Sequence, residues 1–273
     1  MKTAAICVLI FAACGPGPRR GAGGDDDGTT SDAAMGSGTG SGSGSGQIVY
    51  VYAHTDTTLY RVDPDTLAIS EVGDFAWPDG TDQMTDIAID KNSNMIGISF
   101  DKVYKVDPTT AHATLLSASL DGDFNGLSFV PATMLNQTGD DVLVGTRNSD
   151  GVVFRIDPMT GAATQIGDMG AAFSSSGDLV AVDGFGTVQT VPGSSSDQLA
   201  TLATGTFSAT AIGAGTGYSE IWGLAFWKGK VYGFTDQGEF VLIDPTTGVA
   251  TLVSTNSQAW WGAAVTTVAP TIE

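Results

Sequence analysis

The 273-residue sequence has little of what most metal and thiol sites require. Its two cysteines, Cys7 and Cys14, both lie near the N-terminus, so residues 47–273 hold no cysteine for a disulfide, a zinc cluster or a thiol nucleophile. The two histidines, His54 and His112, are too few for a multi-histidine metal site. No run of about 18 apolar residues could form a membrane-spanning helix. These deficits exclude most metalloenzyme and thiol-enzyme classes.

Positive charge is also scarce. The chain has 11 Lys and Arg residues against 30 Asp and Glu residues, which gives a formal net charge of -19. An acidic chain gains nothing from counterion release at phosphates, so we expect no nucleic-acid partner. The 42% of hydrophobic residues is enough for a packed core. Self-repulsion of the excess carboxylates favours solubility and the binding of cations. We expect a monomer.

Residues 1–13 have the pattern of an export signal, in which a lysine precedes an apolar run. The run ends in Phe11-Ala12-Ala13-Cys14, which resembles the lipobox of bacterial lipoproteins. The small Ala13 fits that motif, whereas Phe11 departs from the usual Leu or Val. The resemblance implies cleavage before Cys14 and acylation of its thiol. The alternative is an ordinary secretory signal followed by an incidental cysteine.

A lipidated Cys14 would place the protein in the bacterial cell envelope, anchored to a membrane by its N-terminus. Each buried CH₂ of an acyl chain contributes about 0.8 kcal/mol, so several chains hold a protein firmly. Gly15 stands where inner-membrane lipoproteins carry Asp, which favours the outer membrane. Residues 14–46 are rich in Gly, Ser and Asp and predict a disordered tether. The folded domain is expected to cover residues 47–273.

One short pattern recurs along that domain. A strand-like alternation of apolar and polar residues runs into an Asp-Pro turn, and a second alternating segment follows. The four copies are Asp63-Pro64, Asp107-Pro108, Asp157-Pro158 and Asp244-Pro245. The gap between the last two predicts a fifth copy that has lost its Asp, here called the worn copy, which we place at Thr187–Gly193. Five copies give a period of about 45 residues, which is typical of propeller blades.

Each repeat has room for four short strands. In the last repeat, Gly223–Phe226 and Lys230–Phe234 precede the copy of the pattern, and in an earlier one Ala163–Ile166 follows it. Near the C-terminus, Trp260–Val265 matches an innermost strand, whereas Gln47–Tyr52 has the pattern of a second strand. The sequence therefore predicts an all-β, five-bladed β-propeller of four-stranded antiparallel blades, whose C-terminal strand completes the first blade.

Two other architectures stay open, a six-bladed ring and a β-sandwich. The longest insertion between blades is expected at Thr204–Ser219, as a binding loop or as an extension of an outer strand. The repeated Ile-Asp-Pro-x-Thr-Gly turn, best seen at Ile156–Gly161, resembles that of bacterial β-propeller repeat proteins. This resemblance covers residues 47–273 and implies the architecture, while such blades serve many unrelated functions.

Two acidic loops are candidates for a Ca²⁺ site. The segment that begins at Asp121 resembles the opening of a D-x-[DN]-x-[DN]-G calcium loop, in which oxygens two residues apart face one cation. It lacks the closing Glu, because Ala132 stands in its place. The alternative is two Gly/Asp-rich loops without a metal. The candidate ligands are Asp121, Asp123 and Asn125 in this loop and Asp79, Asp82 and Asp86 in the loop one blade earlier.

A second candidate site is one mouth of the propeller axis. Aligned innermost strands put Thr85, Asn125, Trp222 and Trp261 at one equivalent position, with Gly177 in the worn blade, and put Gln83, Asp123, Glu220 and Ala259 two residues earlier. Two indoles beside amide and carboxylate groups suit a sugar or another small ligand. Packing of the tryptophans between blades is the alternative.

Together these patterns predict a lipid-anchored envelope propeller with a non-catalytic role in ligand binding or protein interaction, with a carbohydrate or an envelope protein as partner. The alternative function is a carbohydrate-active hydrolase, which needs two or three carboxylates around the axis. Asp86, Asp123 and Glu220 are the best such set. Against it, no family signature surrounds them, and basic residues that could clamp a substrate are scarce. His54, placed between two strands, and His112 are weak acid–base candidates.

Overall fold

The computed structural model describes residues 50–272. The predicted signal peptide, Cys14 and the tether at 14–46 lie outside the described residues. Within the described part, no helix has the length and apolar character needed to span a membrane.

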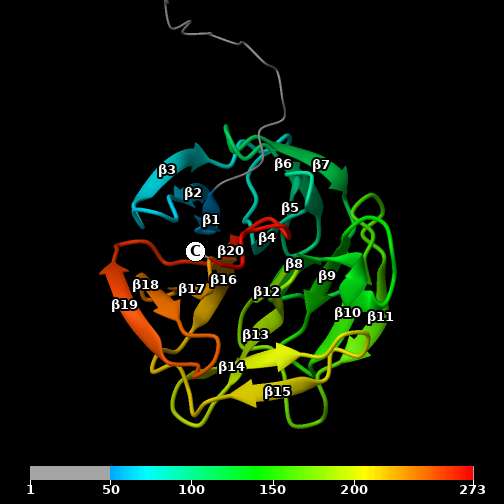
Figure 1. Cartoon of the computed structure of the whole chain (residues 1–273). Helices are drawn as coiled ribbons and strands as arrows, with labels where there is room; N and C mark the ends of the chain where they lie inside the picture. Colours follow the sequence, from blue (N-terminus) through cyan, green and yellow to red (C-terminus); the bar gives the residue numbers. More distant parts are fainter. Residues whose placement is uncertain (1–49, 273) are drawn as a thin grey trace, which may run out of the picture. The chain divides into compact units, whose positions relative to one another are not determined.

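Twenty strands in residues 50–272 form five four-stranded antiparallel sheets around a common axis (Figure 1). The predicted five-bladed β-propeller is confirmed, and the six-bladed and sandwich alternatives are wrong. From the axis outward, blade 1 contains β20 (Gly262–Ala264), β1 (Val51–His54), β2 (Thr58–Val62) and β3 (Ile69–Asp74), and blade 2 contains β4 (Asp86–Ile89), β5 (Met95–Ile98), β6 (Val103–Val106) and β7 (Ala113–Ser117).

The other three blades repeat this order. Blade 3 contains β8 (Gly126–Val130), β9 (Val142–Thr146), β10 (Val152–Ile156) and β11 (Ala163–Asp168), and a single 3₁₀ turn, η1 (Ala132–Leu135), follows β8 within the described chain. Blade 4 contains β12 (Leu179–Val182), β13 (Gly186–Pro192), β14 (Asp197–Leu202) and β15 (Ala209–Ile212). Blade 5 contains β16 (Ile221–Trp227), β17 (Lys230–Thr235), β18 (Glu239–Ile243) and β19 (Ala250–Thr255). The innermost strands β20, β4, β8, β12 and β16 contact one another in turn around the axis.

The C-terminal strand closes the ring, as predicted. β20 pairs with β1 in antiparallel register, with Tyr52 opposite Ala264 and His54 opposite Gly262. Because blade 1 takes its innermost strand from one end of the chain and the other three from the other end, backbone hydrogen bonds join the two ends. The inner edge of β1 is therefore paired rather than exposed.

The Asp-Pro pattern marks the turn between the third and fourth strands of a blade. Asp63 Oδ1 accepts hydrogen bonds from the backbone N–H groups of Asp65 at 3.0 Å and Thr66 at 2.9 Å. Asp107, Asp157 and Asp244 accept equivalent bonds in their own turns. These four carboxylates satisfy turn backbone on the outer side of the blades, so they take no part in a site at the axis.

The structure corrects our placement of the worn repeat. Thr187–Gly193 is not a third strand with its turn but belongs largely to β13, the second strand of blade 4. The turn between β14 and β15 is built around Ala203, whose N–H donates to Ser208 O at 3.0 Å and whose carbonyl accepts from Phe207 N at 2.8 Å. With Ala203 in place of the Asp and Thr204 in place of the Pro, the turn lost the residues that mark it in the sequence.

The predicted insertion at Thr204–Ser219 is wrong for the same reason. Its first residues form the turn around Ala203, and β15 follows directly after. The rest of the predicted insertion, residues 213–219, belongs to the connection between β15 and β16.

The core lies between the blades. Trp260, for example, is fully buried and packs edge-on against Tyr60 of blade 1 and Phe234 of blade 5, with ring centroids 5.2 and 5.6 Å apart. This is the packing between blades that is the alternative to a ligand site for the tryptophans near the axis. It applies to Trp260, whereas Trp222 and Trp261 are only half-buried.

Candidate functional site

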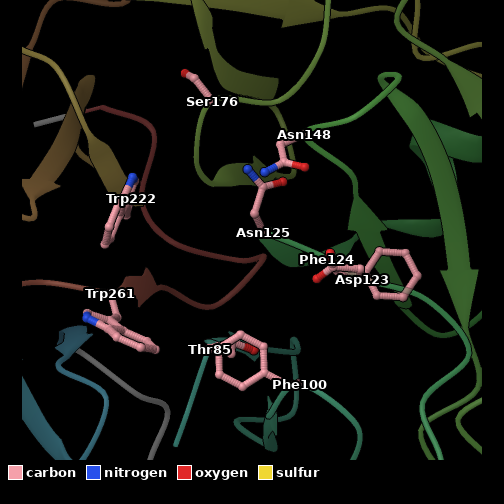
Figure 2. A pocket seen from close by; sticks show the side chains of 9 residues that line it. All are labelled: Thr85, Phe100, Asp123, Phe124, Asn125, Asn148, Ser176, Trp222 and Trp261. Atoms are coloured by element: carbon pink, nitrogen blue, oxygen red, sulfur yellow. The ribbon is translucent and has the colours of Figure 1, made fainter.

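A cavity of about 420 Å³ lies where the innermost strands begin, at one mouth of the axis. The nine residues that line it come from blades 2, 3, 4 and 5 and from the segment that leads into β20: Thr85, Phe100, Asp123, Phe124, Asn125, Asn148, Ser176, Trp222 and Trp261 (Figure 2). The volume falls in the range of small-molecule sites.

Three aromatic rings form one side of this cavity. The rings of Trp222 and Trp261 are 6.5 Å apart between centroids and nearly perpendicular, at 86°. Phe100 stands against Trp261 at 6.4 Å and 78°. Figure 2 shows these rings around one open space, with the ring of Phe124 directed away from it. Phe100 is 60% exposed, so its side chain lacks most of the roughly 2 kcal/mol that full burial of a phenylalanine contributes.

Polar side chains form the other side. Asn125 Oδ1 is buried and has no hydrogen-bond partner within residues 50–272. Thr85 Oγ1 instead donates to the backbone of Ile98 at 3.1 Å. A buried acceptor without a donor costs about 1–3 kcal/mol. A ligand that donates a hydrogen bond to Asn125 would recover this energy once the amide turns its oxygen towards the cavity.

Further along the innermost strands, two carboxyl groups lie near the axis, and the imidazole of His54, from the second strand of blade 1, lies next to one of them. Asp86, Asp178 and His54 are all fully buried. Asp178 ties blades together, because its carboxyl oxygens accept the backbone N–H of Leu224 at 2.7 Å and of Leu179 at 2.6 Å. Asp86 Oδ1 accepts the N–H of Ile87 at 2.8 Å.

Burial decides the charge of these three groups. Burial lowers the pKa of His54 to about 4. It raises the pKa of Asp178 well above the usual value, and burial together with the negative charge of Asp178 does the same for Asp86. His54 Nε2 lies 3.9 Å from Asp86 Oδ1, which is too far for a hydrogen bond. Near neutral pH this contact therefore involves an uncharged imidazole and is not an ion pair.

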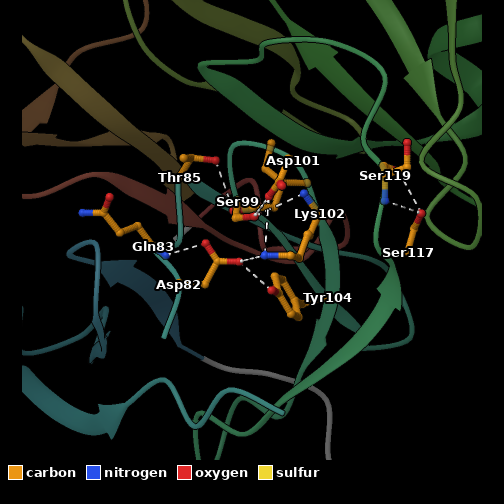
Figure 3. Close-up of polar contacts among 10 residues, drawn as sticks. Asp82, Gln83, Thr85, Ser99, Asp101, Lys102, Tyr104, Ser117 and Ser119 are labelled. Atoms are coloured by element: carbon orange, nitrogen blue, oxygen red, sulfur yellow. Dashed lines mark hydrogen bonds and ion pairs between the residues drawn. The ribbon is translucent and has the colours of Figure 1, made fainter. Parts of the chain in front are cut away.

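The candidate calcium ligands have different surroundings in the structure. Asp82 Oδ2 accepts hydrogen bonds from Lys102 Nζ at 2.9 Å and from Tyr104 Oη at 2.6 Å (Figure 3). Although burial alone would raise the pKa of Asp82, these two hydrogen bonds hold it below the usual value. Asp86 lies buried at the axis, whereas Asp79 and Asp121 are exposed.

Across residues 50–272, no group of three or more His, Cys, Asp or Glu side chains is arranged to hold a metal ion. Calcium binding by these loops stays a prediction.

The structure brings together most of the predicted ligand-binding residues. Trp222, Trp261 and Asn125 line the cavity. Glu220 does not: its side chain is exposed and accepts a hydrogen bond from Gln237 Nε2 at 3.1 Å. Ser176 lines the cavity where Gly177 was expected, because Thr190 O accepts from Ser176 N and Thr190 N donates to Asp178 O, which leaves Gly177 as an extra, bulged residue.

Sequence reasoning missed the axial carboxyl of Asp178 and two lining residues, Phe100 and Asn148. Both lining residues come shortly after the end of a second strand, β5 or β9, where the chain returns to the mouth of the axis. Their position after these strands was the available signal. His54, expected between two strands, is instead the last residue of β1, and it lies fully buried beside Asp86.

No protein-family model matches this chain, and no curated protein matches it in sequence. Solved structures do match it, 609 chains in all. One is from the crystal structure of a nidogen/laminin complex, with a TM-score of 0.51, 9% identity, and coverage of 79% of this chain and 97% of that chain. Another is BamB from Moraxella catarrhalis, with a TM-score of 0.36, 15% identity, and coverage of 74% of this chain and 57% of that chain. The likeness to the first shows the β-propeller fold alone.

Proposed function

We propose that this chain is a non-catalytic binding protein of the bacterial cell envelope, which takes a small ligand into the cavity at the mouth of its propeller. The observation that carries the proposal is the pair of half-buried indoles, Trp222 and Trp261, which face an open cavity beside the unpartnered acceptor Asn125 Oδ1. A ligand with an apolar face and a hydrogen-bond donor would satisfy both features at once.

The distribution of carboxylates favours binding over hydrolysis. A glycoside hydrolase needs two carboxyl groups that flank the bond to be cleaved. Asp86 and Asp178 are fully buried. Both carboxyl oxygens of Asp178 and Oδ1 of Asp86 accept backbone N–H groups, whereas the buried Asp86 Oδ2 has no partner within residues 50–272. Among the described residues that line the cavity, Asp123 alone carries a carboxylate, and Glu220 lies outside that lining. One carboxylate cannot supply both the acid and the base or nucleophile.

Two kinds of ligand follow from the predicted functions. A carbohydrate could lay one apolar face on an indole and donate a hydroxyl to Asn125. A protein partner could insert a side chain, and the matching chain from the nidogen/laminin structure was crystallised in a complex of that description. In either case the cavity residues form the contact.

The envelope location rests on the lipobox-like segment that ends at Cys14. Acylation of this cysteine would hold the monomeric propeller at the outer membrane through the tether at 14–46. Replacing the thiol by a hydroxyl, Cys14→Ser, is expected to move the protein from the membrane fraction to the soluble fraction of lysed cells. Retention of the variant in membranes would contradict a lipid anchor.

Thermal unfolding of the full chain tests the binding function. A ligand that binds only the folded state raises its stability. Maltose and N,N′-diacetylchitobiose serve as neutral probes, and choline serves as a cationic probe. We expect at least one probe class to raise Tm in the native protein and not in Trp261→Ala. Met159→Ala is the matched control, because Met159 is 64% exposed on an outer turn and does not line the cavity. Equal shifts in all three proteins would contradict the proposal.

A further inference from the structure

The cavity has the features of an aromatic cage for a positively charged group. Resting on the proposed function, we propose that its ligand is an organic cation with a methylated ammonium group, held by Trp222, Trp261 and Phe100.

The ring orientation fits a compact, nearly spherical group better than a flat one. A sugar stacks on a single flat aromatic face, whereas here the ring pairs meet at 86° and 78° with centroids 6.5 and 6.4 Å apart. Perpendicular rings form a corner whose walls can touch the same small group from different sides. A cation held within about 6 Å of a ring centroid is attracted to the face of that ring, most strongly for Trp.

The charge around the cavity also favours a cationic ligand. No Lys or Arg is found among the described residues of the cavity lining, while Asp123 contributes a carboxylate. The two basic residues nearest to the lining in sequence are already paired. Lys102 Nζ lies 2.9 Å from Asp82, and an Arg147 guanidinium nitrogen lies 2.6 Å from Asp150. With a net charge of -19 on the chain, an anion would be repelled from this mouth and a cation attracted.

The polar side fits the remainder of such a ligand. The cavity of about 420 Å³ is larger than a trimethylammonium group, so the ligand extends beyond the cage. Asn125 Oδ1, a buried acceptor with no partner in residues 50–272, would receive a hydroxyl or N–H from that extension. A choline-like molecule carries both groups, a methylated ammonium and a hydroxyl. The same ammonium occurs in a free solute and in a phosphatidylcholine headgroup.

Calorimetric titration at low salt tests the proposal, with the full chain in a Cys14→Ser form that cannot be acylated. The probes are choline and its uncharged carbon isostere, 3,3-dimethylbutan-1-ol. We expect choline to bind at least tenfold more tightly than the isostere. Trp261→Leu should remove most of this preference, whereas Trp261→Phe should keep part of it, because an aromatic face is retained. Met159→Ala again serves as the control.

The outcomes separate this inference from the proposed function. Equal binding of choline and the isostere, or cavity-dependent binding of maltose or diacetylchitobiose without choline, would overturn the ammonium assignment and leave a ligand-binding cavity. Absence of cavity-dependent binding for every probe would overturn both. Co-sedimentation with phosphatidylcholine vesicles, but not with phosphatidylglycerol vesicles, would assign the lipid headgroup as the source. Binding of choline without co-sedimentation would assign the free solute.

Discussion

His54 makes the stability of the propeller depend on pH. Its Nδ1 and the carbonyl of Thr55 are 2.8 Å apart, and its ring is fully buried beside Asp86. Burial lowers its pKa from 6.5 to about 4. Between these two pH values the unfolded chain binds a proton that the folded domain does not. This contribution to stability is therefore present above pH 6.5 and is lost as the pH falls towards 4.

The size of the effect follows from that shift. Each pKa unit corresponds to about 1.36 kcal/mol, so His54 accounts for about 3 kcal/mol. Asp86 and Asp178 act in the opposite sense. Their pKa values are raised in the folded state, so the folded domain takes up their protons first and gains stability as the pH falls through those raised values. As the pH falls, His54 therefore lowers the stability of the native protein, whereas Asp86 and Asp178 raise it.

A comparison with His54→Leu isolates the histidine term, because leucine cannot bind a proton. Urea unfolding at pH 7 and pH 4 should show that the stability of the native protein relative to this variant is about 3 kcal/mol greater at the higher pH. In a His112→Gln background His54 is the sole histidine, so its ring signals can be followed by NMR. A stability difference that is constant with pH, or a His54 titration near 6.5, would refute the reasoning.

Three further predictions concern closure and metal binding. In Gly262→Ala the new methyl group would collide with Asp86 Oδ1 and His54 Nε2, so β20 or these two buried side chains must shift, and urea unfolding should show a loss of about 1–3 kcal/mol; an unchanged stability would mean that the structure around Gly262 has spare room. Deletion of residues 259–273 removes β20 and should unfold the domain cooperatively, whereas an unchanged Tm would contradict closure by this strand. If the acidic loops bind calcium, excess Ca²⁺ will raise Tm relative to EDTA, and coincident melting curves would remove that hypothesis.

The architecture was predictable because its signal is local and repeated. Each Asp-Pro turn caps its own backbone within a few residues, so Asp63 and Asp157 mark their hairpins whatever the rest of the chain does. The same dependence on local chemistry explains the error in blade 4. There Ala203 makes the turn with backbone hydrogen bonds alone, and a pattern search based on Asp and Pro passes over it.

The site was predictable only in part, since it forms where five blades meet. Equivalent positions on the innermost strands located Trp222 and Trp261, because the ring repeats the same geometry in each blade. Phe100 lies on a connection, where the repeat is weakest. Asp178 and His54 are polar residues next to or within apolar strands, and their burial depends on neighbours supplied by other blades.

The indole N–H signals of the five tryptophans test the central claim most directly, because each reports on one ring. In a ¹H–¹⁵N spectrum recorded during a choline titration, we predict that the signals of Trp222 and Trp261 shift together with a single Kd. The signals of the buried Trp227 and Trp260 should stay in place. Stationary signals for both cavity tryptophans, or equal shifts in all five, would contradict an ammonium-binding site at this mouth of the propeller.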